Sequence, residues 1–298
     1  MVKSISLQHF QEFYLKHRYI LFEELIDYYA LFGGLEEESI ELYNPLDEIV
    51  TTLALNDSAK KQLPFFLFDK PFREFLIRLA RSDGKIDSLL QRLKIGQRVG
   101  EEIIEELLVN GIVRKRESRE SPFRLYPKQA IKRELRSYRI EDKLYFTKPF
   151  FRFWFAFIEP YFTKDRTVDN KHLLENFYKE RYRLSSAIFE DLSNELIRVH
   201  FQEHDPIVEY GSLWNYHSEF DIFAKTKSGK VIIGECKYKN RPIVKSELVK
   251  LESKTELSAI NADFYALFSK SGFSKEFQKS EESNLLLFTL EDFKRLLI

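Results

Sequence analysis

The chain has 298 residues, of which 44% are hydrophobic and 32% are charged, and its 47 basic and 47 acidic residues give a net charge of zero. This length and apolar content predict a soluble globular protein with two or three domains and exclude a chain too polar to form a core. A neutral net charge argues against a strong general affinity for nucleic acid.

The sequence points to a cytoplasmic location. Its single cysteine, Cys236, excludes an internal disulfide and a cysteine-rich zinc site, which fits a reducing compartment. Residues 1–6 lack the apolar core of a signal peptide. The longest aromatic run, residues 150–158, is interrupted by Arg152 and is too short to span a bilayer. We therefore expect no membrane partner.

Residues 1–62 are predicted to form a helical first domain with an acidic surface. Residues 1–60 contain eleven acidic and four basic residues, whereas residues 112–148 contain twelve basic and five acidic residues. The zero net charge therefore hides a dipolar distribution. The acidic segment is a candidate surface for a protein partner.

The second predicted domain, residues 63–165, has the element order of a winged helix-turn-helix. Apolar spacing and turn residues predict helices over 71–81, 87–93 and 97–110, then wing strands over 112–118 and 123–126. An aromatic connector over residues 145–162 ends the domain. Aromatic residues at this density are more typical of a core between domains than of a base-stacking platform.

Such a domain typically places its third helix in the major groove of DNA and its wing against phosphates. The third helix carries four glutamates between residues 101 and 106, which makes the wing the better candidate for DNA contact. A role as a protein scaffold is an equal alternative. The basic candidates for phosphate contact are Arg98 on the third helix and Arg114, Lys115, Arg116 and Arg119 on the wing.

The third predicted domain, residues 166–298, is an α/β unit. Its expected elements are a helix over 184–199, a strand over 207–210, a β-hairpin over 219–237, a helix over 244–257, a strand over 263–268, a short helix near 274–278, a strand over 285–288 and a closing helix over 291–297.

The hairpin carries the chemistry. Asp221 lies on its first strand, and Glu235 and Lys237 lie on its second, where the period of two places the last two residues on one face. Two carboxylates that converge from neighbouring strands can bind Mg²⁺ or Mn²⁺, with Lys237 placed to orient a water or stabilise phosphate charge. An E-x-K triplet is common in a charged chain. Here, however, it follows the apolar run 231–234 of a buried strand, where a carboxylate without a cation is costly.

This order of helix, three strands, helix and strand, with its Asp221 and Glu235-Cys236-Lys237, resembles the PD-(D/E)xK restriction-endonuclease-like fold with its αβββαβ core. Phe220 stands where the motif's name has Pro. The resemblance implies a metal site of Asp221, Glu235 and Glu190 from the first helix, with Glu195 a weaker candidate for the helix carboxylate. It also makes Lys250 and Lys254, on the helix after the motif, candidates for phosphate contact, although a solvated helix face explains them equally well.

A narrower resemblance involves Trp214, residues 218–222 and residues 234–238. These look like the nuclease-like tail of an archaeal and bacterial family in which this tail follows an AAA-type ATPase and a winged helix. Residues 145–155 resemble the aromatic junction of those proteins, and residues 29–34 resemble part of their ATPase lid. No G-x-x-x-x-G-K-[ST] motif occurs. We therefore expect a chain without the ATPase core, and a separate ATPase that binds the acidic segment is one implied partner.

The favoured prediction is a Mg²⁺- or Mn²⁺-dependent DNA nuclease with catalytic residues Asp221, Glu235, Lys237 and Glu190. The alternative is a module that binds DNA or protein without cutting. The sequence leaves the choice between DNA and RNA open, and no feature of it specifies an oligomeric state.

Overall fold

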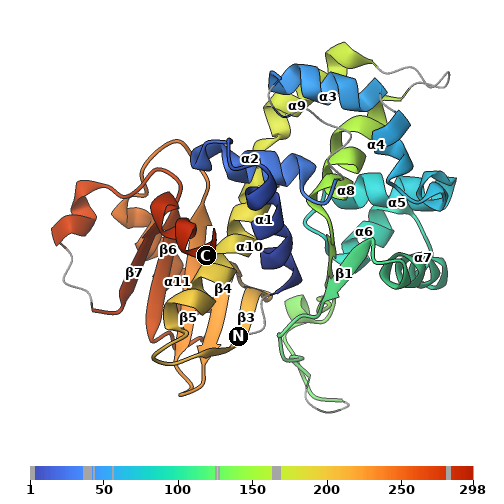
Figure 1. The fold of residues 1–298 in the computed structure, drawn as a ribbon. Coiled ribbons are helices and arrows are strands. Elements are labelled where there is room, and N and C mark those ends of the chain that lie inside the picture. Colours follow the sequence, from blue (N-terminus) through green and yellow to red (C-terminus); the bar gives the residue numbers. More distant parts are fainter. Residues whose placement is uncertain are drawn as a thin grey trace. The chain divides into compact units, whose positions relative to one another are not determined.

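The computed structural model describes residues 4–35, 42, 44–55, 57–124, 126, 128–162, 169–279 and 283–297 (Figure 1). The chain forms two compact units. We call residues 15–117 and 141–185 the helical unit, and residues 1–14, 118–140 and 186–298 the sheet unit. This mixed composition, with helices first and a five-stranded sheet later, confirms the predicted α+β class. No helix in the described ranges is long and apolar enough to cross a membrane.

Short helices dominate the helical unit. In chain order they are α2 (Phe22–Phe32), α3 (Leu46–Leu55), α4 (Asp57–Lys61), η2 (Phe65–Phe68), α5 (Lys70–Ala80), α6 (Ile86–Leu93), α7 (Gln97–Val109), α8 (Pro149–Phe153), the π-helix η4 (Trp154–Ile158), η5 (Glu159–Tyr161) and α9 (Asn170–Glu180). Helices α1 (Ile5–Lys16) and α10 (Tyr182–Phe201) each contribute residues to both units. The predicted boundary at residues 165 and 166 lies outside the described residues.

The aromatic connector forms the core of the helical unit. Phe153, Trp154 and Phe155 have no exposed surface. The ring of Phe153 packs against Phe32 of α2 and Phe177 of α9, with centroids 6.1 and 6.0 Å away. Large aromatic side chains provide much of the apolar area that a small core can bury. These rings therefore lie in the core of one unit, whereas the sequence favoured a core between domains.

The three helices predicted before the wing are present as α5, α6 and α7, but the predicted pairing of the wing is wrong. Strand β1 (Val113–Arg116) pairs antiparallel with β2 (Lys143–Phe146). Residues 123, 124 and 126 are not in a strand. The physical reason is burial: Leu144 of β2 is 2% exposed and its N–H donates to Gly84 O at 2.9 Å, so β2 closes the core of the helical unit.

The sheet unit contains a five-stranded mixed sheet. Its strands are β3 (Ile207–Trp214), β4 (Glu219–Thr226), β5 (Val231–Lys237), β6 (Phe264–Ser269) and β7 (Leu285–Thr289), in that spatial order. Strands β3, β4 and β5 are antiparallel, and β5, β6 and β7 are parallel. The predicted hairpin is confirmed as β4 and β5.

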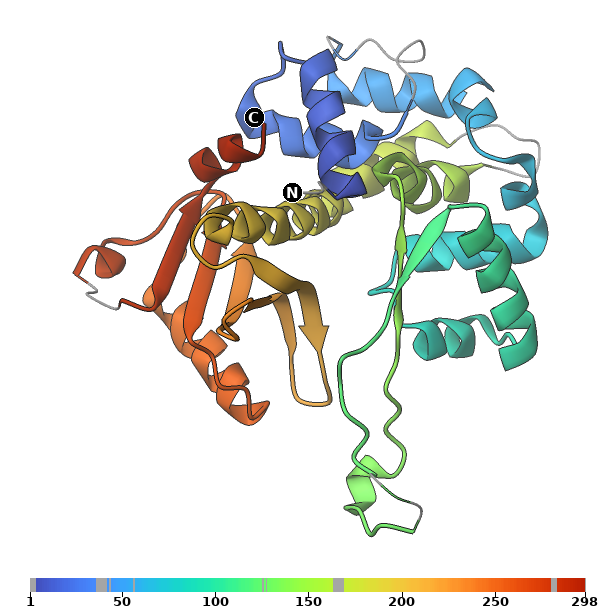
Figure 2. The same cartoon turned by 60° about the horizontal axis from the view of Figure 1, so that its bottom comes forward.

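Residues 186–201 of α10 and helix α11 (Lys245–Leu257) lie on opposite faces of this sheet (Figure 2). The side chains of Glu235 and Cys236 on β5 point to opposite faces of the sheet, because successive side chains of a strand alternate. Their partners therefore identify which helix covers each face. Glu235 pairs with Lys254 of α11, whereas the Cys236 thiol contacts Ser193 of α10. The remaining elements are the 3₁₀ helices η3 (Arg133–Leu135), η6 (Lys275–Lys279) and η7 (Leu290–Leu297).

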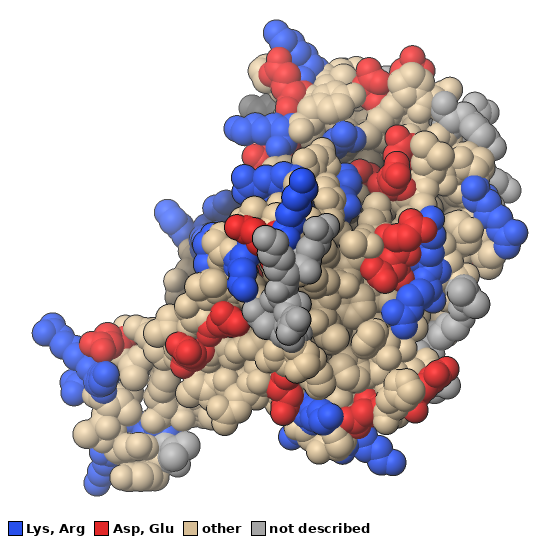
Figure 3. Space-filling model, turned by 90° about the vertical axis from the view of Figure 1, so that its left-hand side faces the viewer, with Lys and Arg blue, Asp and Glu red and all other residues tan. Residues whose placement is uncertain are grey.

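Basic and acidic side chains are interspersed over the face drawn in Figure 3. The described residues on this face therefore form no broad patch of one sign, in keeping with the zero net charge of the chain.

Gly234 lets β5 pack closely between its neighbours. A Cβ at this position would lie 2.7 Å from Ala266 O on β6 and 3.0 Å from Ile222 Cβ on β4. Gly234→Ala is therefore expected to lower the free energy of unfolding by about 1–3 kcal/mol, since the neighbouring strands must move apart. Urea denaturation measures this change, and an unchanged midpoint would show that the sheet accommodates the methyl group without cost.

Candidate active site

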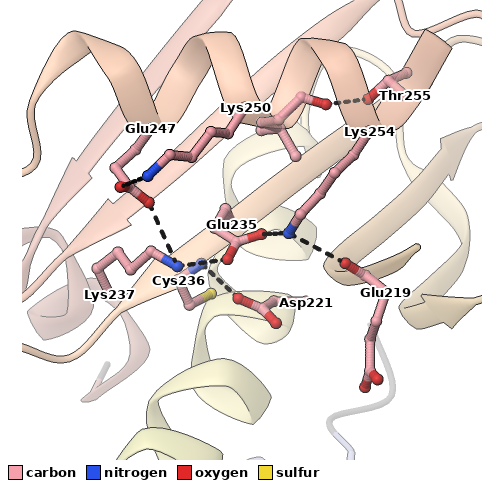
Figure 4. A network of polar contacts seen from close by, with 10 residues as sticks. Glu219, Asp221, Glu235, Cys236, Lys237, Glu247, Lys250, Lys254 and Thr255 are labelled. Atoms are coloured by element: carbon pink, nitrogen blue, oxygen red, sulfur yellow. Dashed lines mark hydrogen bonds and ion pairs between the residues drawn. The ribbon is translucent and has the colours of Figure 1, made fainter. Parts of the chain in front are cut away.

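The hairpin brings Asp221 and Glu235 side by side at one end of the sheet (Figure 4). The β4–β5 ladder ends with the pair of Ile222 and Gly234, and Asp221 and Glu235 are the next residues along their strands. The β3–β4 register shifts at this point, because Asp221 and Ile222 together face the single residue Ser212. This is a β-bulge, a feature that re-aims side chains and is frequent next to active sites.

The bulge interrupts the alternation of side chains along β4. Strict alternation would place Phe220 and Phe223 on opposite faces, but both pack in the cluster that contains Ile233 of β5 and Leu248 of α11. Asp221 is positioned by the hydrogen bond that its Oδ2 accepts from Cys236 N at 2.8 Å. A backbone donor of this kind holds a carboxylate in one orientation.

The carboxyl group of Asp221 is in an environment that disfavours its ionised form. Burial, and next the charge of Glu235, raise its pKa to about 7, against the opposing effects of the Cys236 N–H and of the charges of Lys237 and Lys254. A cation placed between two neighbouring carboxylates reduces their repulsion and lowers the free-energy cost of ionising both. Asp221 and Glu235 thus form a donor pair suited to a hard divalent ion, which proteins typically hold through one or two carboxylates plus phosphate oxygens.

The carboxylate of Glu235 forms ion pairs with two lysines. Its Oε1 accepts from Lys237 Nζ at 2.5 Å and its Oε2 from Lys254 Nζ at 3.0 Å, and its side chain is 13% exposed. Lys237 also lies 3.8 Å from Glu247 of α11, which pairs with Lys250 at 2.7 Å. The result is a chain of alternating charges from Lys250 to Lys254 across β5 (Figure 4).

Lys237 keeps its proton in this setting. Desolvation lowers the pKa of Lys237, but its hydrogen bond to Glu235 and the charges of Glu235, Asp221 and Glu247 outweigh that effect and raise it. The side chain is therefore a cation held within the carboxylate cluster.

The two candidate carboxylates of α10, Glu190 and Glu195, differ in burial and in their partners. Glu195, the weaker candidate, is buried and pairs with Arg198 at 2.7 Å. Glu190 is half-buried, and its backbone O accepts from Asn194 Nδ2, which also donates to Asp221 O at 3.1 Å. Among the described residues, no group of three or more His, Cys, Asp or Glu side chains is arranged to hold a metal ion. The role of Glu190 as a third ligand stays a prediction.

The predicted DNA-contacting residues of the helical unit have partners within it. Arg98 pairs with Glu102 at 3.1 Å and Lys115 with Asp142 at 2.9 Å. Arg114 and Arg116 lie over the ring of Tyr145, 5.6 and 4.9 Å from its centroid. Exposed pairs of this strength cost little to break, so their role in DNA contact stays a prediction.

Arg119, Lys250 and Lys254 have clearer structural tasks. Arg119 pairs with Glu209 of β3 at 2.7 Å and also binds two β3 carbonyls, which ties it to the sheet unit and not to a wing. Lys250 and Lys254 pair with the site acids Glu247 and Glu235. The sequence prediction missed Glu247. Its signal was the spacing of residues 247, 250 and 254, which places them on one helix face.

One family model matches about a third of the chain. Residues 154–255 match the family model DUF234, described as archaea bacterial proteins of unknown function. A solved structure titled as a half-complex of Thermococcus gammatolerans McrB AAA+ hexamers with bound McrC is 14% identical over all of this chain and 72% of that chain, with a TM-score of 0.24. That score is too low to indicate a shared fold. The search of curated proteins found no match.

Proposed function

We propose that this protein is a metal-dependent nuclease that hydrolyses phosphodiester bonds, with Mg²⁺ or Mn²⁺ held by Asp221 and Glu235. The observation that carries the proposal is the cluster at the β-bulge, where Asp221, Glu235 and Lys237 converge from two neighbouring strands. Burial of two adjacent carboxylates is unfavourable for folding alone, which favours a functional reason for the arrangement.

Each side chain has a distinct task in this proposal. Asp221 and Glu235 supply oxygen ligands, and the Cys236 N–H keeps Asp221 oriented. When bound, the cation lowers the pKa of a water and neutralises charge on the phosphate. Lys237 donates to a phosphate oxygen or holds the attacking water, and Glu247 keeps Lys237 near the site when a ligand displaces it from Glu235.

We further infer a restriction-endonuclease-like core in the sheet unit. Its support is the order of α10, the antiparallel strands β3 to β5, α11 and the parallel strand β6, with the acids on β4 and β5. Helices α5 to α7 with the β1–β2 ribbon support a winged helix in the helical unit. A separate ATPase as partner stays a prediction, and the acidic residues 36–38 and Glu41 of its predicted surface lie outside the described residues.

Cleavage assays test the proposal. Labelled single-stranded, duplex and branched DNA and single-stranded RNA are incubated with the full chain and Mg²⁺ or Mn²⁺. We expect cleavage of at least one DNA substrate with either ion and none in EDTA, because the two carboxylates need a cation to act on a phosphate. Cleavage that persists in EDTA, or no cleavage of any substrate with either ion, would contradict the assignment.

A second function has specific support. Both oxygens of Glu235 are already paired with lysines, so the cluster is neutralised without a metal. Such a cluster can present Lys237 and Lys254 to a phosphate backbone without cutting it. Binding of DNA in the cleavage assay without any product would favour this function over hydrolysis.

A further inference from the structure

The segment between β1 and β2, residues 118–140, belongs to the sheet unit although both flanking strands belong to the helical unit. We call it the arm. Within it the structure describes all residues except 125 and 127. Among these described residues the one regular element is the 3₁₀ helix η3, so other contacts must hold the arm against the sheet unit.

Arg119 anchors the arm to the edge of the sheet. Its guanidinium donates to Tyr210 O at 2.8 Å and Ser212 O at 3.0 Å, and it pairs with Glu209 at 2.7 Å. Strand β3 is an edge strand, since β4 is its sole partner in the sheet order of the described strands. An edge strand presents carbonyls without ladder partners, and the planar fork of an arginine can satisfy two of them at once.

A second anchor fastens the arm to the turn between β3 and β4. Glu120 accepts hydrogen bonds from Tyr216 N at 2.9 Å and from the Tyr138 hydroxyl. The rings of Phe123, Tyr138 and Tyr216 contact one another, with centroids 5.0 to 5.8 Å apart. Polar and aromatic contacts together give the arm a defined position on this turn.

The same turn leads into the candidate active site. Strand β4 begins at Glu219, three residues after Tyr216, and Asp221 follows within the bulge. Lys254 Nζ lies 3.5 Å from Glu219 O and 3.0 Å from Glu235 Oε2. Ser258 Oγ, at the C-cap of α11, lies 3.5 Å from Asn215 Oδ1 in the turn. The arm is therefore fixed to the end of the sheet that carries the carboxylates.

The exposed surface of the arm is strongly basic. One acidic residue, Glu134, is exposed among its described residues. Tyr126, with 63% of its surface exposed, adds an aromatic ring to the basic surface. Cations interleaved with an accessible aromatic ring suit a phosphate backbone with stacking bases better than an acidic protein surface. Besides the anchoring Arg119, the exposed basic residues are Arg124, Lys128, Lys132, Arg133, Arg136 and Arg139.

We propose that the arm is a nucleic-acid-binding element that holds the phosphate backbone of a strand and directs it to the site of Asp221 and Glu235. The inference rests on the proposed function for the identity of that site. The arm supplies affinity through its cations, and its anchors at Arg119 and Glu120 determine where along the strand the site acts. The neutral net charge of the chain is compatible with this role, because the cations are concentrated in one segment.

A binding measurement tests the affinity. Anisotropy of labelled DNA is followed in EDTA with the Asp221→Asn full chain, which separates binding from cleavage. Adding Lys132→Gln and Arg133→Gln is expected to weaken binding about tenfold at low salt and to reduce the slope of log affinity against log salt by about 1.8, that is about 0.9 for each lost phosphate contact. The matched control, Lys171→Gln with Lys179→Gln on α9, is expected to change affinity less than twofold.

The proposal is overturned if the arm and control variants bind alike. It is also overturned if unlabelled polyglutamate competes as well as unlabelled DNA, since the arm would then be a site for acidic protein. Weaker binding by the arm variant, together with the absence of cleavage by the wild type, would support the arm and reject hydrolysis. The two proposals can thus fail separately.

A second variant tests the positioning. Arg119→Ala removes the clamp on β3 but keeps the six exposed cations. We expect its affinity for DNA to stay within about threefold of the wild type and its cleavage rate at saturating DNA to fall about tenfold or more, with circular dichroism unchanged. An unchanged cleavage rate would show that the anchors do not position the strand.

Discussion

Cleavage is expected to fall at least about 100-fold when Asp221 is replaced by Asn or Glu235 by Gln, measured as single-turnover rate with Mg²⁺ at saturating DNA. Each replacement keeps the size of the side chain and removes one of the two anionic ligands. In the Asp221→Asn variant the amide oxygen can still accept the Cys236 N–H, so the bulge geometry is retained. The loss of rate then reports on metal binding and phosphate activation and not on folding.

The control for these variants is Glu256→Gln on α11, which removes an exposed carboxylate away from the cluster. Its rate is expected to stay within twofold of the wild type. Mn²⁺ titration followed by electron paramagnetic resonance gives a readout independent of activity, because Asp221→Asn is expected to weaken the binding of the free ion. If Asp221→Asn keeps more than a tenth of the wild-type rate with full metal affinity, the assignment of Asp221 is wrong.

Local patterns were sufficient to predict the hairpin that carries the site. The apolar run of residues 231–234 and the polar tip around Gly229, whose φ is +94°, determine β5 and its turn. Once these strands pair, Asp221 and Glu235 must become neighbours. The carboxylate pair was therefore predictable from about twenty consecutive residues, and the structure brings the two together.

Contacts between distant segments were not predictable in the same way. Alternating residues at 123–126 have the pattern of a strand, yet β1 pairs with β2, where the buried Leu144 completes a core. The bulge at Asp221 depends on the register of β3 against β4. Gly211 of β3, whose φ is +130°, is a local sign of an irregularity in this sheet, but it does not predict which residues of β4 form the bulge. Arg119 was predicted to contact phosphates because it lies among the basic residues that follow the first predicted wing strand. Its partners on β3 lie about ninety residues away.

Asp221 is also expected to make folding stability and cleavage respond to pH in opposite directions. Its pKa is raised from 3.8 to about 7 in the folded protein, chiefly by burial and next by Glu235. The folded state therefore keeps a proton that the unfolded chain loses near pH 4. In EDTA, this contribution to stability is fully present below about pH 4 and is lost as pH rises through about 7. Urea denaturation of the wild type, compared with Asp221→Asn at each pH, measures it.

A divalent cation competes with that proton, so cleavage with Mg²⁺ is expected to rise up to tenfold per pH unit below about pH 7 and then to level off. Added Mg²⁺ should stabilise the wild type most above pH 7, where the carboxylates of Asp221 and Glu235 repel each other. In Asp221→Asn, neither the rise of cleavage with pH nor the larger stabilisation by Mg²⁺ above pH 7 is expected. A difference in stability between wild type and Asp221→Asn that stays constant from pH 4 to 8 would contradict the electrostatic account of the site. If stability in EDTA falls with pH while the cleavage rate with Mg²⁺ rises, then one event explains both. The ionisation of Asp221 destabilises the metal-free fold and also produces the carboxylate that binds the cation.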